Sequence, residues 1–460
     1  MSDLLRQKSS TSNLKISGRK IARASLADSL LALRDVILPT LAKGPLIRRR
    51  KVVAFSERHG VDDKAVQRMQ NLRRKYGAGP LVIAIPFRPQ ALLLSADDVR
   101  VVLEKSPEAF AAATMEKRSA LSHFEPENVL ASRGSERQQR RMLNEDTLET
   151  GCQMHSMAVH FANVVDEEMS RVCDTAAEDG QLDWNRFFTV WMRMVRRIVL
   201  GDAAADDSDL TDLLEKLRYR ANYAFLRPKA KEQRRELLAR LRAYVEIAAP
   251  ESLAGKMASH STDPSQMPHH QLPQYLFAFD PGAMATFRTL AMLSVEPSAH
   301  SRAKSEIDAT CSEPAPLLPF LRACYLETLR LWPTTPAILR ETVKAIAWSE
   351  GQLETGTQII IFTPFLHRDD ETVRDAHTFQ PDRWIGTVAH PEAGLVPFSY
   401  GPVQCPAAHF VPMIATLAMR RVLGKLNLQM VDPQRLMLER LPATFDNFTL
   451  RFAVSARTNA

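Results

Sequence analysis

Hydrophobic and polar positions alternate with helical periodicity through the middle of the chain, whereas short apolar runs occur near both ends. The runs 81–85 and 91–94 flank a turn that contains two prolines, a pattern typical of a β-hairpin. Ser95 then precedes two aspartates, which predicts that a helix begins directly after it.

From there to about residue 335 the pattern predicts mainly helices. The segment 183–200 is strongly amphipathic, with Asp183 suited to cap its start and Gly201 to end it. Residues 209–228 and 231–248 predict two further helices. The polar stretch 255–274 contains prolines and lacks periodicity, so it is expected to form a loop.

Short β-rich runs return late in the chain, at residues 343–348, 358–362 and 448–454. Strands this far apart in sequence must pair with one another, which predicts a mainly α protein with a small β region, an α+β fold in one large domain. We expect residues 1–50 to form a basic N-terminal extension that could be flexible, and residues 51–460 to form the large domain.

Composition adds limits to this picture. The chain has 460 residues, 45% of them hydrophobic and 25% charged, as in soluble globular proteins. Its net charge of +7 is spread along the sequence and does not imply nucleic acid. Five cysteines without a CxxC pair suggest a reducing cytoplasm, and no run approaches the length of a transmembrane segment.

The most informative segment surrounds Cys405, which ends a loop rich in glycine, proline and aromatic residues, 397–407. An apolar helix is predicted over 408–426, so the thiol is expected to meet the positive end of a helix dipole, which favours thiolate. A thiolate on a stiff loop suits a nucleophile or a metal ligand. A buried structural cysteine is the simpler alternative.

A second signal is the pair Glu327 and Arg330, three residues apart on one face of the predicted helix 317–332. Such a pair is usually a solvated surface contact. Here the segment is strongly apolar, so the pair is expected to be buried and to need further partners, and Arg383 offers a second guanidinium.

Together these motifs resemble the cytochrome P450 superfamily of haem-thiolate monooxygenases, in its soluble bacterial type. Its Glu-x-x-Arg helix, Phe-x-Pro-x-Arg-Trp loop and Phe-x-x-Gly-x-x-x-Cys loop occur here in order, within a resemblance that covers about residues 75–455. The resemblance implies haem b (iron protoporphyrin IX) as the cofactor, with Cys405 as the axial ligand of its iron. Glu327, Arg330 and Arg383 would brace the core that binds the haem.

The resemblance also implies further contacts with the haem. Phe398 would lie near the thiolate, Gly401 would let the loop approach the porphyrin, Ala407 replaces a common glycine, and Arg340 and Arg140 would bind the propionates. The sequence departs from the family pattern at Glu136, which stands where a Trp or His is usual, and at Val403, which replaces a propionate-binding Arg or His. A solvated basic helix is the alternative for the segment around Arg140.

The apolar segment 275–293 matches the helix on the distal side of the haem, where the family commonly has Ala-Gly-x-acid-Thr. In the simplest alignment Met284 and Ala285 replace the acid and the threonine, a pair that normally relays protons. Gly282 and Thr286 are then the expected catalytic residues, Gly282 for close approach of a distal ligand and Thr286 for proton delivery. Asp280 followed by Pro281 is also typical of a helix that restarts with a cap.

The leading functional hypothesis is an oxidoreductase that inserts oxygen from O2 into a small apolar organic substrate. Electrons would come from a separate ferredoxin or flavodoxin-type donor, for which Arg133, Arg137 and Arg141 offer a basic face. The alternatives are a peroxide-dependent or rearranging haem-thiolate enzyme and a haem- or ligand-binding protein without turnover. An apolar pocket is expected from Phe110, Met115, Phe124, Phe225, Phe279, Met284 and Ile338.

Overall fold

The computed structural model of the chain describes residues 19–85, 88–247 and 249–457. It is mainly helical with three small sheets, as the sequence predicts. The longer helices are α4 (Val61–Tyr76), α7 (Gly134–Leu148), α8 (Ala158–Asp179), α9 (Trp184–Leu200), α10 (Ser208–Ala221), α11 (Lys231–Glu246), α13 (Pro268–Val295), α14 (Pro297–Ala309), α15 (Pro319–Leu331) and α17 (Phe410–Lys425). The shorter helices are α1 (Leu26–Ala32), α2 (Leu38–Ala42), α3 (Arg50–Arg58), α5 (Ala96–Glu104), α6 (Met115–Leu121), α12 (Leu253–His260) and α16 (Thr363–Arg368).

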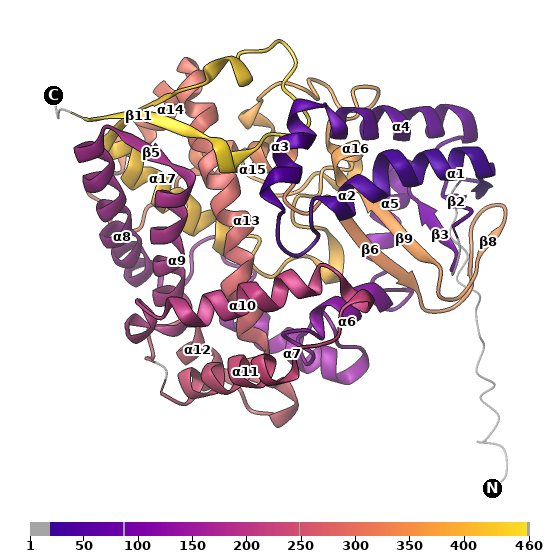
Figure 1. Ribbon diagram of the computed structural model, residues 1–460, viewed down its shortest axis with the longest axis horizontal. Helices are drawn as coiled ribbons and strands as arrows, with labels where there is room; N and C mark the ends of the chain where they lie inside the picture. Colours follow the sequence, from indigo (N-terminus) through magenta and orange to yellow (C-terminus); the bar gives the residue numbers. More distant parts are fainter. Residues whose placement is uncertain (1–18, 86–87, 248, 458–460) are drawn as a thin grey trace, which may run out of the picture.

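The largest sheet has six strands in the order β1-β2-β3-β9-β6-β4, and it joins segments from both halves of the chain. Figure 1 shows this sheet at one side of the molecule, with α1, α4 and α5 beside it. Its strands are β1 (Ala22–Arg23), β2 (Leu81–Ile83), β3 (Gln90–Leu92), β4 (Phe110–Ala111), β6 (Ala337–Thr342) and β9 (Gln358–Phe362). The other strands are β5 (Gln181–Asp183), β7 (Ile346–Ala347), β8 (Gln352–Leu353), β10 (Leu426–Met430) and β11 (Arg451–Ala456), which form a sheet β10-β11-β5 and a pair β7-β8.

Several local predictions are confirmed. β2 and β3 form the expected antiparallel hairpin, with Ile83 opposite Gln90. The Ser95 hydroxyl accepts a hydrogen bond from the Asp98 N–H and caps α5. The Asp183 carboxylate caps α9 in the same way, and Gly201 follows its last turn.

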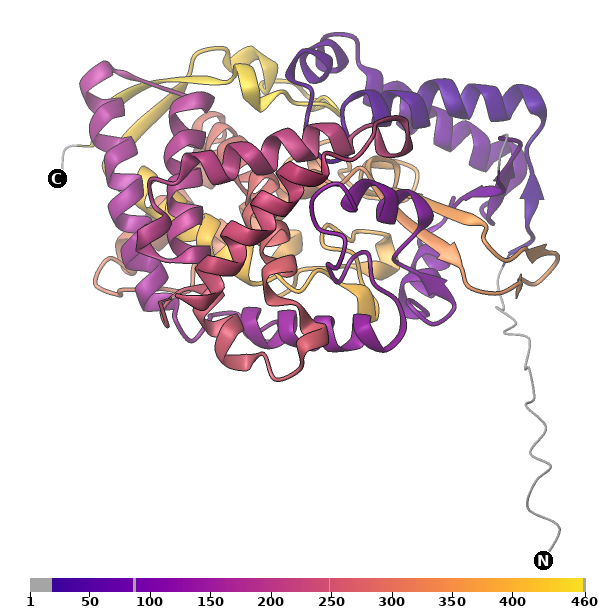
Figure 2. The ribbon, with the colours of Figure 1, turned by 60° about the horizontal axis from the view of Figure 1, so that its bottom comes forward.

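Helix α13 runs through the middle of the molecule, where it packs against α9, α11, α15 and α17 (Figure 1). In Figure 2 the magenta helices α10 and α11 lie in front of this central region. A large hydrophobic cluster fills the helical part, and a smaller one lies beside the six-stranded sheet. The region around α13 is therefore enclosed by elements from most of the chain.

Three predicted boundaries need correction. Part of the loop expected at 255–274 is helical, because α12 extends to His260 and α13 already begins at Pro268. The helix expected from residue 408 begins at Phe410, and β10 takes over at Leu426. Residues 19–50 are not a separate extension: β1 pairs with β2, and Ala32 and Val36 are buried in the smaller cluster. The rest of that predicted extension, residues 1–18, lies outside the described residues.

Candidate functional site

The loop that carries Cys405 is fixed by backbone contacts before α17 begins. Gly401 has φ of 72°, and a Cβ there would lie 2.7 Å from the Leu103 carbonyl oxygen of α5, so this position requires glycine. The Cys405 N–H donates to the Phe398 carbonyl at 2.9 Å. Arg141 of α7 donates to the Gln404 carbonyl at 2.8 Å, which ties the loop to a second helix.

Cys405 is a free cysteine in this loop, and the residue is partly exposed. The expected help from a helix dipole is wrong, because α17 begins five residues later, at Phe410. Burial among neighbouring atoms instead raises the pKa of the Cys405 thiol, and the Ala407 N–H and Arg141 only partly oppose this effect. A metal ion would have to supply the charge that stabilises a thiolate here.

Glu327 and Arg330 form a buried pair on α15, as the apolar segment around them predicts. Arg330 Nε and Nη2 donate to the Glu327 carboxylate at 2.8 and 2.7 Å, and both side chains are 0% exposed. Trp384 Nε1 donates to the same carboxylate at 2.7 Å, and Arg383 lies 3.4 Å from it. The remaining Arg330 donors bond backbone carbonyls of His367, Ala376 and Thr378. The network ties α15 to the loop before Cys405.

Three cations from separate elements converge near this loop: Lys117 of α6, Arg137 of α7 and Arg340 of β6. Arg340 donates only to uncharged oxygens, those of Ser106, Leu339 and Ser399. The Lys117 ammonium and the Arg137 guanidinium have no hydrogen bond or ion pair within the part of the chain that the structure describes. Burial, Arg340 and Arg137 together lower the pKa of Lys117 to about 7. A group with negative charge is needed to balance this cluster.

Arg140 lies outside the cluster, although the sequence suggested it as a propionate ligand. Its guanidinium is 3% exposed and donates to Ser132, Glu127 and the Ser265 carbonyl, so its donors are already used. Arg137, three residues earlier, faces the cluster instead, and Arg141, the next residue after Arg140, faces the cysteine loop. The functional face of α7 is therefore displaced by one residue from the predicted alignment.

On α13 the residues that are partly exposed also differ from the residues that were expected to face the haem. Ala278 and Pro281 keep partial exposure within this central helix, whereas Gly282 and Thr286 are fully packed. A Cβ on Gly282 would lie 3.1 Å from Val411 Cγ1 of α17. The Thr286 hydroxyl donates to the Gly282 carbonyl at 2.8 Å within the helix. These positions argue against the catalytic roles expected for Gly282 and Thr286 and favour packing roles.

Asp280 does not cap a new helix, because α13 continues through Pro281 without a break. Its carboxylate instead accepts a hydrogen bond from Arg218 of α10 at 2.6 Å, and both side chains are largely buried. The acid nearest to the accessible face of α13 is thus engaged in an ion pair. The next residue, Pro281, has no hydroxyl that could move a proton.

The other predicted residues lie close to the cysteine loop. Phe398 and Ala407 are partly buried and pack against the large hydrophobic cluster, and Val403 is nearly buried. Among the predicted pocket residues, Phe110, Phe124, Phe279 and Ile338 are buried, Met115 and Phe225 are exposed, and Met284 lines a cavity.

The residues present fit a haem. Haem offers an iron for one thiolate and two carboxylates for a cluster of cations, and Cys405 and the three cations supply both. No group of three or more His, Cys, Asp or Glu gathers as a metal site within residues 19–457 as far as the structure describes them. A single sulfur ligand agrees with an iron held mainly by a macrocycle.

A mainly helical fold with a cysteine-bearing loop before a long helix is the arrangement expected of a haem-thiolate protein. The C-terminal part of the chain is similar to the cytochrome P450 superfamily. The family model described as Cytochrome P450 matches residues 274–445, which include α15 and the Cys405 loop. A solved structure, retinoic acid bound cyanobacterial CYP120A1, matches the fold with a TM-score of 0.70, covering 84% of this chain and 94% of that one, at 16% identity.

Curated relatives match over shorter segments. Carotene epsilon-monooxygenase of Arabidopsis thaliana is 29% identical over 42% of this chain and 38% of its own length. Methyltetrahydroprotoberberine 14-monooxygenase of Papaver somniferum is 27% identical over 32% of this chain and 30% of its own length. The chain thus matches about a third of the length of these relatives. Among the helices that the structure describes, none has the length and apolarity to cross a membrane.

Sequence reasoning missed Lys117 and Pro281 as site residues. It assigned Arg137 to a docking face, not to the cofactor. Helical spacing offered a signal, because Arg137 and Arg141 are four residues apart and share the face of α7 that meets the cysteine loop. Lys117 lies far from the motifs in sequence and had no such signal.

Proposed function

We propose that the chain is a haem-thiolate monooxygenase that inserts one oxygen atom from O2 into an apolar organic substrate. The observation that carries the proposal is the pairing of a partly exposed Cys405 with the unbalanced cations Lys117, Arg137 and Arg340. The names of the matched relatives, two of them monooxygenases, support it.

In this proposal each residue has a defined task. Cys405 binds the iron of haem b, and Lys117, Arg137 and Arg340 bind its propionates. The bound haem supplies the oxygen chemistry, which electron donation from an axial thiolate favours. The Ala407 N–H and Arg141 lie beside the sulfur and stabilise its negative charge. Phe398 and Ala407 pack around the loop and restrict access of water to the sulfur.

Electrons come from a separate protein of ferredoxin or flavodoxin type in this proposal. Of the three arginines expected to form its docking face, Arg133 is exposed and pairs with Glu341. Arg137 and Arg141 are turned toward the interior contacts described above. The docking surface therefore needs basic residues beyond these three.

One observation favours a second candidate, an enzyme that uses peroxide in place of O2. Pro281 cannot relay a proton, and Asp280 is bound to Arg218. Peroxide already carries the protons and electrons that O2 must receive. Product formation with hydrogen peroxide alone, and none with a ferredoxin, its reductase and NADPH, would establish this alternative.

The test of haem-thiolate ligation is a carbon monoxide difference spectrum of the reduced protein. We expect a red-shifted band in the wild type that disappears in Cys405→Ser. The control is Cys311→Ser, since Cys311 is free and exposed, and this variant should keep the band. A wild-type protein that takes up haem without this band would refute the proposal.

A further inference from the structure

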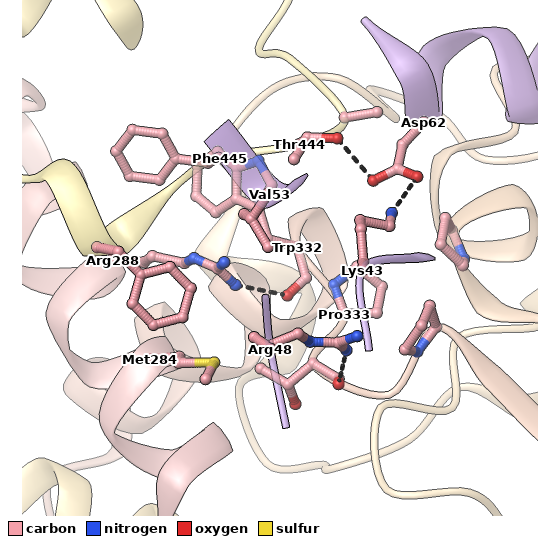
Figure 3. Close-up of a pocket in the computed structure, with 15 residues that line it drawn as sticks. Lys43, Arg48, Val53, Asp62, Met284, Arg288, Trp332, Pro333, Thr444 and Phe445 are labelled. Atoms are coloured by element: carbon pink, nitrogen blue, oxygen red, sulfur yellow. Dashed lines mark hydrogen bonds and ion pairs between the residues drawn. The ribbon is translucent and has the colours of Figure 1, made fainter. Parts of the chain in front are cut away.

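A cavity lies one turn of α13 beyond Pro281, between the N-terminal helices, the loop after α15 and the segment 443–448. Figure 3 shows its lining, in which Met284 and Arg288 project from α13. Trp332 and Pro333 lie across from them in Figure 3, and Thr334 also lines the cavity. None of these cavity residues is needed for haem ligation in the proposal above.

The charges that line the cavity are unequal. Lys43, Arg48 and Arg288 are cationic, and Asp62 is the only carboxylate among the lining residues. Lys43 and Asp62 form a buried ion pair, and the Thr444 hydroxyl also donates to Asp62. Since Asp62 is committed to these partners, Arg48 and Arg288 carry the excess positive charge.

Both arginines bond only backbone carbonyls. Arg48 donates to the Gly44 carbonyl at 2.8 Å and to the Thr334 carbonyl at 2.6 Å. Arg288 is 8% exposed and makes one long bond of 3.4 Å, to the Trp332 carbonyl, while its Nε has no partner in the described structure. Neither guanidinium forms an ion pair within the described residues. Figure 3 shows both guanidinium groups next to the Trp332–Pro333 segment.

The burial of the Arg48 and Arg288 guanidinium groups is energetically unfavourable unless an anion binds them. Burial of a guanidinium without a carboxylate is unfavourable. Burial lowers the pKa of Arg288 to about 10, and the positive charges of Arg48 and Arg435 add to this effect, although Asp446 and Glu57 partly oppose it. Planar guanidinium groups match the geometry of carboxylate and phosphate oxygens.

The surroundings of the cavity define the rest of the ligand. Met284 belongs both to the cavity and to the partly exposed face of α13 that carries Pro281. Thr334 and Pro336 lead directly into β6, which holds Arg340 of the cation cluster. The cavity volume of about 50 Å³ suits a small polar group and is too small for a whole substrate.

We propose that this cavity binds the acidic group of an otherwise apolar substrate, with Arg48 and Arg288 as its ligands. The inference rests on the proposed monooxygenase function and narrows its substrate class to apolar molecules with one carboxylate or phosphate. The apolar part would extend past Met284 toward the face of α13 that carries Pro281. The acidic end of the substrate would thus be held in the cavity. This anchor would determine which part of the apolar chain lies at the face of α13 that carries Pro281.

The test is a calorimetric titration of the haem-loaded protein with dodecanoate, dodecyl phosphate and 1-dodecanol at slightly alkaline pH and low ionic strength. We expect the anions to bind about tenfold or more tightly than the alcohol, as charge-assisted hydrogen bonds require. Comparison of the two anions identifies whether carboxylate or phosphate is preferred.

Arg48→Gln should remove most of the preference for the anions. Its matched control is Lys51→Gln, which removes the same charge from an exposed residue of α3 with no ion pair in the described structure. Arg288→Gln is the second variant. Arg288→Lys should restore part of the preference if that residue binds the anion through charge.

Three outcomes would overturn the inference. The first is equal binding of the alcohol and the anions. The second is a preference for the anions that survives in both Arg48→Gln and Arg288→Gln. The third is binding of inorganic phosphate without binding of either dodecyl anion. The titration measures heat of binding and not turnover. Its failure is therefore distinguishable from failure of the proposed function, which the carbon monoxide band tests separately.

Discussion

Two buried glutamates, Glu327 and Glu125, differ in the hydrogen-bond partners that this fold gives them. Glu327 is 0% exposed and accepts hydrogen bonds from Arg330, Trp384 and the Gln380 N–H. Glu125 is also 0% exposed, yet neither of its oxygens has a hydrogen-bond partner in the described structure. Burial raises the pKa of Glu125 well above its ordinary value, and Arg218 opposes the shift only in part.

Glu125 should therefore make the protein less stable as the pH rises. The folded state keeps its proton to a higher pH than the unfolded state, so stability is lost from the unfolded pKa, about 4.3, up to the folded pKa. Glu125→Gln mimics the protonated acid and should flatten this decline in melting temperature between acid and neutral pH. Glu178→Gln, an exposed position on α8, is the control and should leave the decline unchanged. A parallel decline in wild type and Glu125→Gln would contradict the assignment.

At the scale of single elements, α13 shows that one glycine can have two explanations. Gly282 in a distal helix suggests space for a ligand, but the structure uses it for helix packing. Its missing Cβ lets α13 approach Val411 of α17 and Trp191 of α9. Sequence alone could not distinguish these roles, because both require a small residue on a buried helix.

Gly282→Ala should therefore destabilise the protein, even though alanine favours helices more than glycine does. The added methyl group would lie 3.1 Å from Val411, and overpacking of this kind costs about 1–3 kcal/mol. Gly424→Ala is the matched control in α17, where a Cβ meets nothing within 4 Å, and it should gain up to about 1 kcal/mol. Urea unfolding of both variants measures the difference. Equal effects in the two variants would refute the packing role.

Local sequence patterns also determined which parts of the site could be predicted. Cys405, Glu327 and Arg330 were found because each motif has a fixed local spacing. Arg140 was predicted as a ligand instead of Arg137 and Arg141 because the alignment was shifted by one residue, from the pair 136/140 to the pair 137/141. Such a shift changes the face of a helix by about a quarter turn, and the sequence has several arginines there. Contacts such as that of Lys117 with Arg340 depend on tertiary packing and have no local pattern.

At the scale of the whole molecule, the N-terminal part belongs to the fold. Basic composition suggested an extension up to residue 50, whereas β1 and α1 complete the edge of the six-stranded sheet. The apolar positions of this part are interrupted by charged residues such as Arg34 and Asp35, so its buried face was not evident from composition. Mainly α architecture and the late strands were predictable, since periodicity determines them over long segments.

Val36→Ala tests whether this N-terminal part contributes to global stability. Val36 is 1% exposed, and its truncation should cost about 1–3 kcal/mol in urea unfolding. Leu38→Ala is the control, because Leu38 is 51% exposed and its truncation should change stability by less than about 0.5 kcal/mol. Similar small effects for both would mean that residues 19–50 detach without cost.

Pro281 has one more consequence for α13. Because proline has no N–H, the Phe277 carbonyl one turn earlier loses the helical donor that residue 281 would normally provide. Phe277, Ala278 and Pro281 keep partial exposure here, so we expect this carbonyl to be free to accept a hydrogen bond from a molecule on that side. A hydroxylated product, or an ordered water, would find a main-chain oxygen there that no side-chain substitution can remove.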